Sequence, residues 1–215
     1  MGEFAADGKF WDRRDAGRRL GSRLLSLSLS QPVVVGLPRG GVLVAVEVSL
    51  ALSAPLGLYV VRKVGFPEQP ELALGAIGQD GSEYFDPTLM AKVGVSASKL
   101  APAVEREKAA LAKRVSLYGS LARMPEVANR TVIIVDDGAA TGATLRVAIS
   151  AMRSKGASYV VAAVPVGAPD ALADLADLAD KVVSLLAPSH FESVSQWYQS
   201  FGQVSDETVL EVLGG

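Results

Sequence analysis

Short, uninterrupted runs of apolar residues recur along the chain and predict buried strands. A strand covered on both faces carries apolar residues at successive positions, whereas a strand with one wet face alternates apolar and polar residues. Strands covered on both faces are typical of parallel sheets, so we expect a mainly parallel sheet. The runs are Val33–Leu37, Leu58–Val61, Val132–Val135, Tyr159–Val164 and Val182–Leu186.

Longer stretches with helical periodicity lie between these runs. They cover Val42–Leu52, Ser98–Leu121 and Ala143–Lys155, and Gly156 stands at a C-cap position after the last of them. Strands that alternate with helices indicate an α/β fold, here a twisted parallel sheet flanked by helices. We interpret the helix over 98–121 as packed on one face and solvated on the other. The alternative is that it forms the interface of a homodimer.

Two segments depart from this alternation. Residues 65–86 are rich in Gly and Pro and contain a candidate strand at Leu72–Ile77, so we expect a long loop with an embedded hairpin. From Pro165 onward, prolines separate short helical pieces and one further strand. We expect this C-terminal part to fold back over the edge of the sheet.

Composition narrows the functional classes. The chain has 215 residues, of which 49% are hydrophobic and 20% charged, with a net charge of -2; this favours one globular domain over residues 1–215 and disfavours a nucleic-acid binder. The absence of cysteine excludes disulfides and thiolate chemistry, and a single histidine excludes a His cluster for zinc. No apolar stretch approaches the roughly 20 residues of a membrane span, and residues 1–15 lack a signal-peptide core. We therefore expect a cytoplasmic protein without a membrane partner.

A loop of small residues after the strand at 132–135 predicts a phosphate site. This loop leads into a helix, and the first amides of a helix point toward a bound anion. Its glycines let the backbone approach a ligand, its alanines keep bulk away, and its two hydroxyls can donate hydrogen bonds. The predicted phosphate-binding residues are Gly138, Ala139, Ala140, Thr141, Gly142, Ala143 and Thr144.

Two adjacent carboxylates, Asp136 and Asp137, stand immediately before this loop. They cannot bind the phosphate, because like charges repel, so they must face sugar hydroxyls or a cation. Hydroxyls beside a phosphate monoester indicate a ribose 5-phosphate. The alternative is that Asp-Asp-Gly merely forms a turn after a strand.

A second glycine-rich turn, Pro38-Arg39-Gly40-Gly41, also leads from a strand into a helix and predicts a second anion site. A substrate with two separated phosphate groups requires such a pair of sites. Arg62 and Lys63 follow the strand at 58–61 and place two cations at the carboxyl edge of the sheet. For these two residues, the alternative is a solvated strand end.

The stretch 132–144 resembles the signature of type I phosphoribosyltransferases that binds 5-phosphoribosyl 1-pyrophosphate (PRPP). More narrowly, nearly the whole chain is similar to a subgroup of uncharacterised bacterial phosphoribosyltransferase-like proteins. Where that subgroup often has Gly after Val194, this chain has Ser195, and the departure concerns the local turn and any base contact there. The further motifs that carry the likeness are Phe10-Trp11-Asp12-Arg13-Arg14-Asp15-Ala16-Gly17, Pro38-Arg39-Gly40-Gly41, Arg62-Lys63, Pro70-Glu71-Leu72-Ala73-Leu74-Gly75-Ala76, Ala163-Val164-Pro165-Val166 and Trp197-Tyr198.

The resemblance implies that a nitrogen nucleophile, usually a nucleobase, displaces pyrophosphate from the anomeric carbon of PRPP, with Mg²⁺ bridging pyrophosphate and ribose oxygens. It implies catalytic roles for Asp136, Asp137 and Lys63, the two carboxylates holding the ribose hydroxyls or the metal. A mobile flap over residues 65–81 would exclude water during the reaction. The implied pyrophosphate-binding residues are Pro38, Arg39, Gly40, Gly41, Arg62 and Lys63.

The resemblance also bears on the acceptor. Enzymes of this family that act on 6-oxopurines carry Asp where this chain has Ala140, so hypoxanthine and guanine are disfavoured. We expect a core over about 30–165 and a hood over the base, built from about 1–20 and 165–215. Each aromatic candidate for the hood has a packing or structural role as its alternative. The base-binding candidates are His190, Phe191 and Trp197, with Trp11 and Tyr198 also able to stack on a planar ring.

Two other functions stay open. The first is a non-catalytic protein that binds PRPP or a nucleotide and regulates another process. The second is an enzyme that acts on a phosphoribosyl compound by phosphorolysis or hydrolysis. The presence of Arg39, Arg62 and Lys63 favours catalysis over sensing, because a sensor has no departing pyrophosphate to stabilise.

Overall fold

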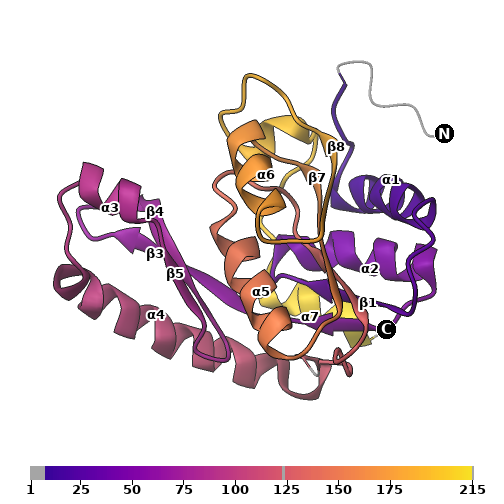
Figure 1. Ribbon diagram of the computed structural model, residues 1–215, viewed down its shortest axis with the longest axis horizontal. Coiled ribbons are helices and arrows are strands. Elements are labelled where there is room, and N and C mark those ends of the chain that lie inside the picture. Colours follow the sequence, from indigo (N-terminus) through magenta and orange to yellow (C-terminus); the bar gives the residue numbers. More distant parts are fainter. Residues whose placement is uncertain (1–7, 123, 215) are drawn as a thin grey trace.

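The computed structural model describes residues 8–122 and 124–214 and contains two sheets (Figure 1). The larger sheet has five parallel strands in the order β2-β1-β6-β7-β8. The predicted α/β class, with a mainly parallel sheet flanked by helices, is confirmed. The strands of this sheet are β1 (Pro32–Gly36), β2 (Leu56–Leu58), β6 (Thr131–Val135), β7 (Tyr159–Val166) and β8 (Lys181–Leu186).

Helices cover both faces of the parallel sheet, which explains why its central strands are apolar at every position. On one face, Val34, Ile133 and Val161 pack against α1 (Arg13–Leu25) and α2 (Gly40–Leu52). On the other face, the alternate residues of the same strands pack against α5 (Ala143–Ser154) and α6 (Pro169–Ala176). Within the described chain, no helix is both long and apolar enough to cross a membrane.

Helix α1 is absent from the predicted elements. Its sequence is dominated by Arg and Gly, so its narrow apolar stripe of Ala16, Leu20 and Leu24 does not stand out. The glycines serve close packing against α2: a Cβ atom on Gly17 would lie 2.8 Å from the carbonyl oxygen of Val44. Asp12 caps the helix by accepting a hydrogen bond from the amide of Asp15 at 2.8 Å.

The smaller sheet is antiparallel, in the order β3-β4-β5, and projects to the left in Figure 1 together with α3 and α4. We call this part, residues 61–118, the arm. Helix α4 runs along the arm and continues beneath the parallel sheet, close to α7 (Asp206–Gly214) (Figure 1). The elements of the arm are β3 (Val61–Phe66), β4 (Gln69–Gly78), β5 (Glu83–Phe85), α3 (Pro87–Lys92) and α4 (Ala97–Tyr118).

The arm corrects two sequence-based predictions. The segment 65–86 contains the expected hairpin but is mostly strand rather than loop, because Gly65, Gly75 and Gly78 lie within β3 and β4, where neighbours leave no room for a side chain. The predicted strand 58–61 is divided: β2 ends at Leu58, and β3 begins at Val61 in the other sheet. Arg62 and Lys63 therefore lie within a strand of the arm and not at the end of a strand of the parallel sheet.

The C-terminal part contains the expected short helices and one further strand, β8. A 3-10 turn at Val194–Trp197 and α7 (Asp206–Gly214) complete this C-terminal part. Another 3-10 turn, Gly119–Ala122, lies earlier in the chain, directly after α4. The two ends of the chain pair: the amide of Phe10 donates to the carbonyl of Trp197 at 2.9 Å, and the amide of Gln199 donates back to Phe10 at 2.8 Å. This contact brings α1 and the C-terminal segment to the same side of the sheet edge.

Candidate active site

A cavity of about 440 Å³ opens beside the carboxyl ends of β1 and β6, which are neighbours in the parallel sheet. Carboxyl ends of parallel strands are where ligands bind in open α/β sheets. The cavity brings together parts of the two loops predicted to bind anions and the two cations of β3. Its lining residues are Arg13, Pro38, Arg39, Gly40, Val61, Arg62, Lys63, Arg114, Asp136, Asp137, Gly138, Ala140, Thr144, Val194 and Phe201. The predicted residues of the two loops that lie outside this lining are Gly41, Ala139, Thr141, Gly142 and Ala143.

Asp136 is the more enclosed of the two carboxylates. One of its oxygens accepts the amide of Asp137 at 2.9 Å, and the other accepts the hydroxyl of Thr144 at 3.1 Å. Removal of the carboxyl from water, and then the neighbouring charge of Asp137, raise the pKa of Asp136 from 3.8 to about 7, against the opposing charge of Lys63. The charged form of Asp136 therefore lowers the free energy of unfolding.

This effect predicts a pH-dependent stability. Because the pKa of Asp136 is raised on folding, the folded protein binds a proton that the unfolded chain has lost, and stability falls as pH rises from about 4 to 7. Asp136→Asn removes this effect. We expect the variant to raise the thermal midpoint relative to the parent by about 5 °C more at pH 8 than at pH 5. Differential scanning calorimetry at both pH values measures the difference, and an equal change at both would contradict the assignment.

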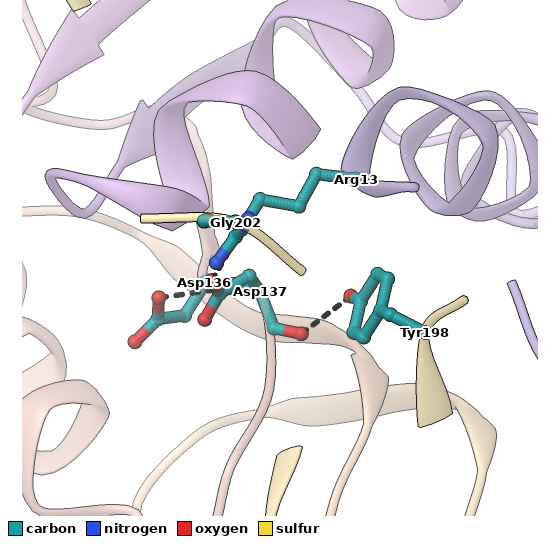
Figure 2. Close-up of polar contacts among 5 residues, drawn as sticks. All are labelled: Arg13, Asp136, Asp137, Tyr198 and Gly202. Atoms are coloured by element: carbon teal, nitrogen blue, oxygen red, sulfur yellow. Dashed lines mark hydrogen bonds and ion pairs between the residues drawn. The ribbon is translucent and has the colours of Figure 1, made fainter. Parts of the chain in front are cut away.

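Asp137 is held by two contacts from distant parts of the chain (Figure 2). The Nε atom of Arg13 in α1 lies 2.7 Å from its carboxylate, and the hydroxyl of Tyr198 donates to its main-chain carbonyl at 2.6 Å. Arg13 is itself fixed, because it donates to the carbonyl of Gly202 at 3.0 Å and lies 3.7 Å from the ring centre of Phe201. Arg13 therefore neutralises one of two adjacent negative charges.

Loss of Arg13 is expected to destabilise the protein. The side chains of Arg13 and Asp137 are only 10% and 18% exposed, so Arg13→Met leaves an unpaired carboxylate beside Asp136. Breaking such a pair costs about 3–5 kcal/mol, which lowers the thermal midpoint by roughly 10 °C. Arg14→Met is the matched control, because its pair with Glu47 involves an arginine that is 47% exposed and is worth about 1 kcal/mol or less. Equal midpoints for the two variants would disprove the role given to Arg13.

The turn after β1 lies directly against the two carboxylates, and its glycines permit this. A Cβ atom on Gly41 would lie 2.8 Å from the Cα atom of Asp136, and one on Gly40 would overlap the carboxylate of Asp137. Only glycine allows the backbone to approach so closely. The peptide bond between Pro38 and Arg39 is cis.

The loop after β6 presents a helix N-terminus to the cavity. Gly142 has φ +71° at the N-cap of α5 and has no side chain to cap the helix, while the amide of Ala143 donates a long hydrogen bond of 3.5 Å to the hydroxyl of Thr141. The following amides at this helix N-terminus are those that can bind an anion. The beginning of the loop is tied to β7, because the amide of Ala139 donates to Val166 at 2.9 Å. Ala139 is also buried in the core, so neither its amide nor its side chain is available to a ligand, while Thr141 and Ala140 are exposed.

The cavity lining also carries several cations, three of which are paired with carboxylates: Arg13 with Asp137, Arg62 with Glu107, and Arg114 with Asp206. The described lining residues include five cations and two carboxylates. Three of the cations, Arg39, Arg62 and Lys63, are among those predicted from sequence. Lys63 is exposed, and Arg62 donates from its Nε atom to Glu107 of α4 at 2.7 Å. Several cations around one cavity, among them the exposed Lys63, suit an anion with more than one phosphate group.

The base-binding candidates lie outside this cavity lining. His190 is exposed, whereas Phe191 and Trp197 pack in a cluster with Phe10 and Tyr198. Within the described lining, the C-terminal segment instead contributes Val194 and Phe201. The side chain of Trp11 is 58% exposed. The base-binding roles of His190, Phe191 and Trp197 stay predictions.

Sequence reasoning did not assign Arg13, Arg114 or Phe201 to the site. Arg13 stands 124 positions before Asp137, and no local pattern connects the two. Arg114 does leave a signal, because it lies on the face of α4 that carries the buried Leu111 and Tyr118. A cation within an otherwise apolar stripe needs a partner in the folded protein.

Comparisons with known proteins agree with this geometry. A family model described as the phosphoribosyl transferase domain matches residues 14–199. A protein of Mycobacterium tuberculosis named "Putative phosphoribosyl transferase Rv0571c" is 44% identical over 204 residues, which cover 95% of this chain and 46% of that protein. The chain thus spans about half the length of this curated relative.

Two solved structures extend the comparison. The crystal structure of the protein TT1426 from Thermus thermophilus is 41% identical, with a TM-score of 0.78, over 95% of this chain and 97% of that chain. A protein from Aquifex aeolicus shares the fold, with a TM-score of 0.53 and 15% identity over 84% of this chain and 77% of that chain.

Proposed function

Because the chain belongs to the phosphoribosyl transferase domain family, we propose that its cavity binds PRPP and transfers the ribose 5-phosphate group to a small nitrogenous acceptor, with release of pyrophosphate. One observation carries this proposal. The carboxylates of Asp136 and Asp137 line one cavity together with Thr144 at the start of α5, where a phosphate monoester would bind, and with Arg39, Arg62 and Lys63, which suit pyrophosphate. PRPP has its ribose hydroxyls between a phosphate monoester and a pyrophosphate group.

In this arrangement, the protein acts chiefly by position and charge. The first amides of α5 hold the 5-phosphate, and Asp136 and Asp137 accept hydrogen bonds from the ribose hydroxyls. The same carboxylates offset the positive charge that develops on the ribose ring as the bond to pyrophosphate breaks. Lys63 and the turn at 38–41 stabilise the negative charge of the departing pyrophosphate. Such preorganised electrostatics is usually the largest contribution to catalysis.

The cavity fits a magnesium ion carried by the substrate. Mg²⁺ typically takes one or two carboxylates together with substrate phosphates, and Asp136 and Asp137 are a donor set of this kind. Among the described residues, no group of three or more ligating side chains offers a site built by the protein alone. Bound Mg²⁺ would neutralise pyrophosphate charge, and Asp136 or Asp137 would orient it.

We further propose a nucleobase as the acceptor. Val194 and Phe201 form an apolar part of the cavity wall that suits a planar ring. Ala140, exposed at the cavity, supplies no carboxylate for a 6-oxopurine, which disfavours hypoxanthine and guanine. A regulatory protein that binds PRPP without turnover, and an enzyme that transfers the group to phosphate or water, are the alternatives. The homodimer and the cytoplasmic location stay predictions.

Calorimetric titration tests the binding step. With Mg²⁺ present, we expect PRPP to bind more tightly than ribose 5-phosphate or pyrophosphate alone, because it occupies both anion sites at once. Fructose 1,6-bisphosphate is the control, since it is a sugar with two phosphate monoesters but no pyrophosphate. It is expected to bind at least about tenfold more weakly, a difference of about 1.4 kcal/mol. Equal affinities for PRPP and fructose 1,6-bisphosphate would contradict the proposal.

A further inference from the structure

We infer that Arg114 on α4 is a further pyrophosphate-binding residue of this cavity, and that Asp206 on α7 is the residue that positions it. This inference rests on the proposed function and adds a helix of the arm to the binding site. It starts from the observation that Arg114 lines the cavity together with Arg39, Arg62 and Lys63.

The helix brings two charged residues to the cavity side by its periodicity. Glu107 and Arg114 are seven residues apart, which is two helical turns, so they share a face of α4. The face also carries the buried Leu111 and Tyr118, which fix the helix against the rest of the molecule. Helix α4 packs against β3 of the arm (Figure 1), and at its far end Arg114 and Tyr118 contact Asp206 of α7.

Arg114 is held at one edge of its guanidinium group. Its Nε atom lies 3.1 Å from an Oδ atom of Asp206, and the hydroxyl of Tyr118 donates to the same oxygen at 2.5 Å. The side chains of Arg114 and Asp206 are only 19% and 22% exposed. The buried Nε of Arg114 makes no hydrogen bond within the described chain despite this ion pair, and Arg114 lines the cavity, so its guanidinium group can donate to a ligand there.

A similar pairing occurs at a neighbouring cation. Arg62 is held through its Nε and one terminal nitrogen by Glu107, at 2.7 and 2.6 Å. In both pairs, a carboxylate lies beside the arginine: Glu107 accepts a hydrogen bond from Arg62, whereas Asp206 forms an ion pair with Arg114 without a hydrogen bond to its Nε. An arginine that is fixed before binding loses less rotamer entropy when it binds a phosphate oxygen. If the ion pair between Arg114 and Asp206 served stability alone, Arg114 would not need to line the cavity.

The binding test compares two ligands and two variants. We would measure the affinities of inorganic pyrophosphate and of ribose 5-phosphate, each with Mg²⁺, for Arg114→Gln and for Lys113→Gln. Lys113 is the matched control, because it carries the same charge on the same helix one position away but is exposed to solvent. Arg114→Gln is expected to weaken pyrophosphate binding about 10- to 100-fold and to change ribose 5-phosphate binding less than about twofold. Lys113→Gln is expected to change neither beyond about twofold.

The positioning role of Asp206 has its own readout. Asp206→Asn keeps the shape of the side chain but weakens its hold on Arg114, so pyrophosphate affinity is expected to fall about three- to tenfold. In the double variant with Arg114→Gln, the second change is expected to have no further effect, because the residue that it positions is already gone. Additive losses would show that Asp206 acts independently of Arg114. Arg114→Lys, which keeps the charge and lacks Nε, is expected to lie between the parent and Arg114→Gln.

The outcomes separate this inference from the proposed function. If the parent binds both ligands and Arg114→Gln and Arg114→Lys bind pyrophosphate as the parent does, the inference is overturned and the proposed function stands. If both ligands weaken equally in a variant whose thermal midpoint is unchanged, Arg114 does not recognise pyrophosphate selectively, and the inference is again overturned. If the parent binds no pyrophosphate at all, the inference and the proposed function are both overturned.

Discussion

Replacing both Asp136 and Asp137 by Asn is expected to weaken PRPP binding at least about a hundredfold while the protein stays folded. Each carboxylate is expected to accept a hydrogen bond from a ribose hydroxyl, and a hydrogen bond to a charged group is worth about 1.5–3 kcal/mol. Loss of two such bonds therefore removes about 3–6 kcal/mol of binding free energy. Calorimetric titration with PRPP and Mg²⁺ measures the change.

The structure also predicts the stability of this double variant. Asp136→Asn relieves a carboxylate whose pKa is raised to about 7, whereas Asp137→Asn weakens the ion pair with Arg13. The two effects oppose each other, so the thermal midpoint is expected to stay within a few degrees of the parent. Asp177→Asn, an exposed change of the same kind, is the control. Unchanged PRPP affinity in the double variant would disprove the ribose assignment.

Replacing Lys63 by Met is expected to lower turnover at least about a hundredfold, with little effect on ribose 5-phosphate. Lys63 faces the carboxylates across the cavity, and its charge partly counters the rise in the pKa of Asp136. Its main expected role is to stabilise pyrophosphate as negative charge develops on it. Loss of one preorganised electrostatic contact of this kind costs about 10²–10³ in kcat. The measurement is kcat/KM for pyrophosphate release, with the affinity for ribose 5-phosphate determined in parallel.

The control for Lys63 is Lys92→Met, which removes an exposed lysine from α3. It is expected to leave turnover unchanged, because α3 does not contribute to the cavity lining among the described residues. If Lys63→Met reduced turnover and ribose 5-phosphate affinity by the same factor, Lys63 would be acting on the phosphoribosyl part of the substrate. That result would contradict its assignment to pyrophosphate.

The parts of the fold that could be predicted from sequence are those in which strand, loop and helix are continuous in the chain. The loop at 136–144 and the turn at 38–41 lie at the ends of buried strands, and buried strands are recognisable from successive apolar residues. Once β1 and β6 are placed side by side in a parallel sheet, their loops must meet at one edge. The central geometry of the cavity follows from that.

The parts of the fold and of the site that could not be predicted depend on contacts between residues far apart in the sequence, or on glycines whose role differs from that of loop glycines. Arg13 reaches Asp137, and Arg114 reaches Asp206, across long stretches of chain, so no periodicity could connect them. In α1 and β4, glycine marks close packing inside an element, whereas at the sequence level Gly and Pro indicated a loop. The sequence therefore predicts a long loop with an embedded hairpin over residues 65–86, although most of this segment is strand.

The most direct test of the central claim is a time course of PRPP with Mg²⁺ and the parent protein, followed by phosphorus-31 nuclear magnetic resonance, with and without pooled nucleobases and small amines. The account predicts that pyrophosphate appears only when an acceptor is present, together with one new phosphate monoester signal from the ribosylated product. Release of pyrophosphate without an acceptor would instead indicate a hydrolase. PRPP that stays intact with every pool, despite measurable binding, would contradict the transferase and favour a regulatory protein.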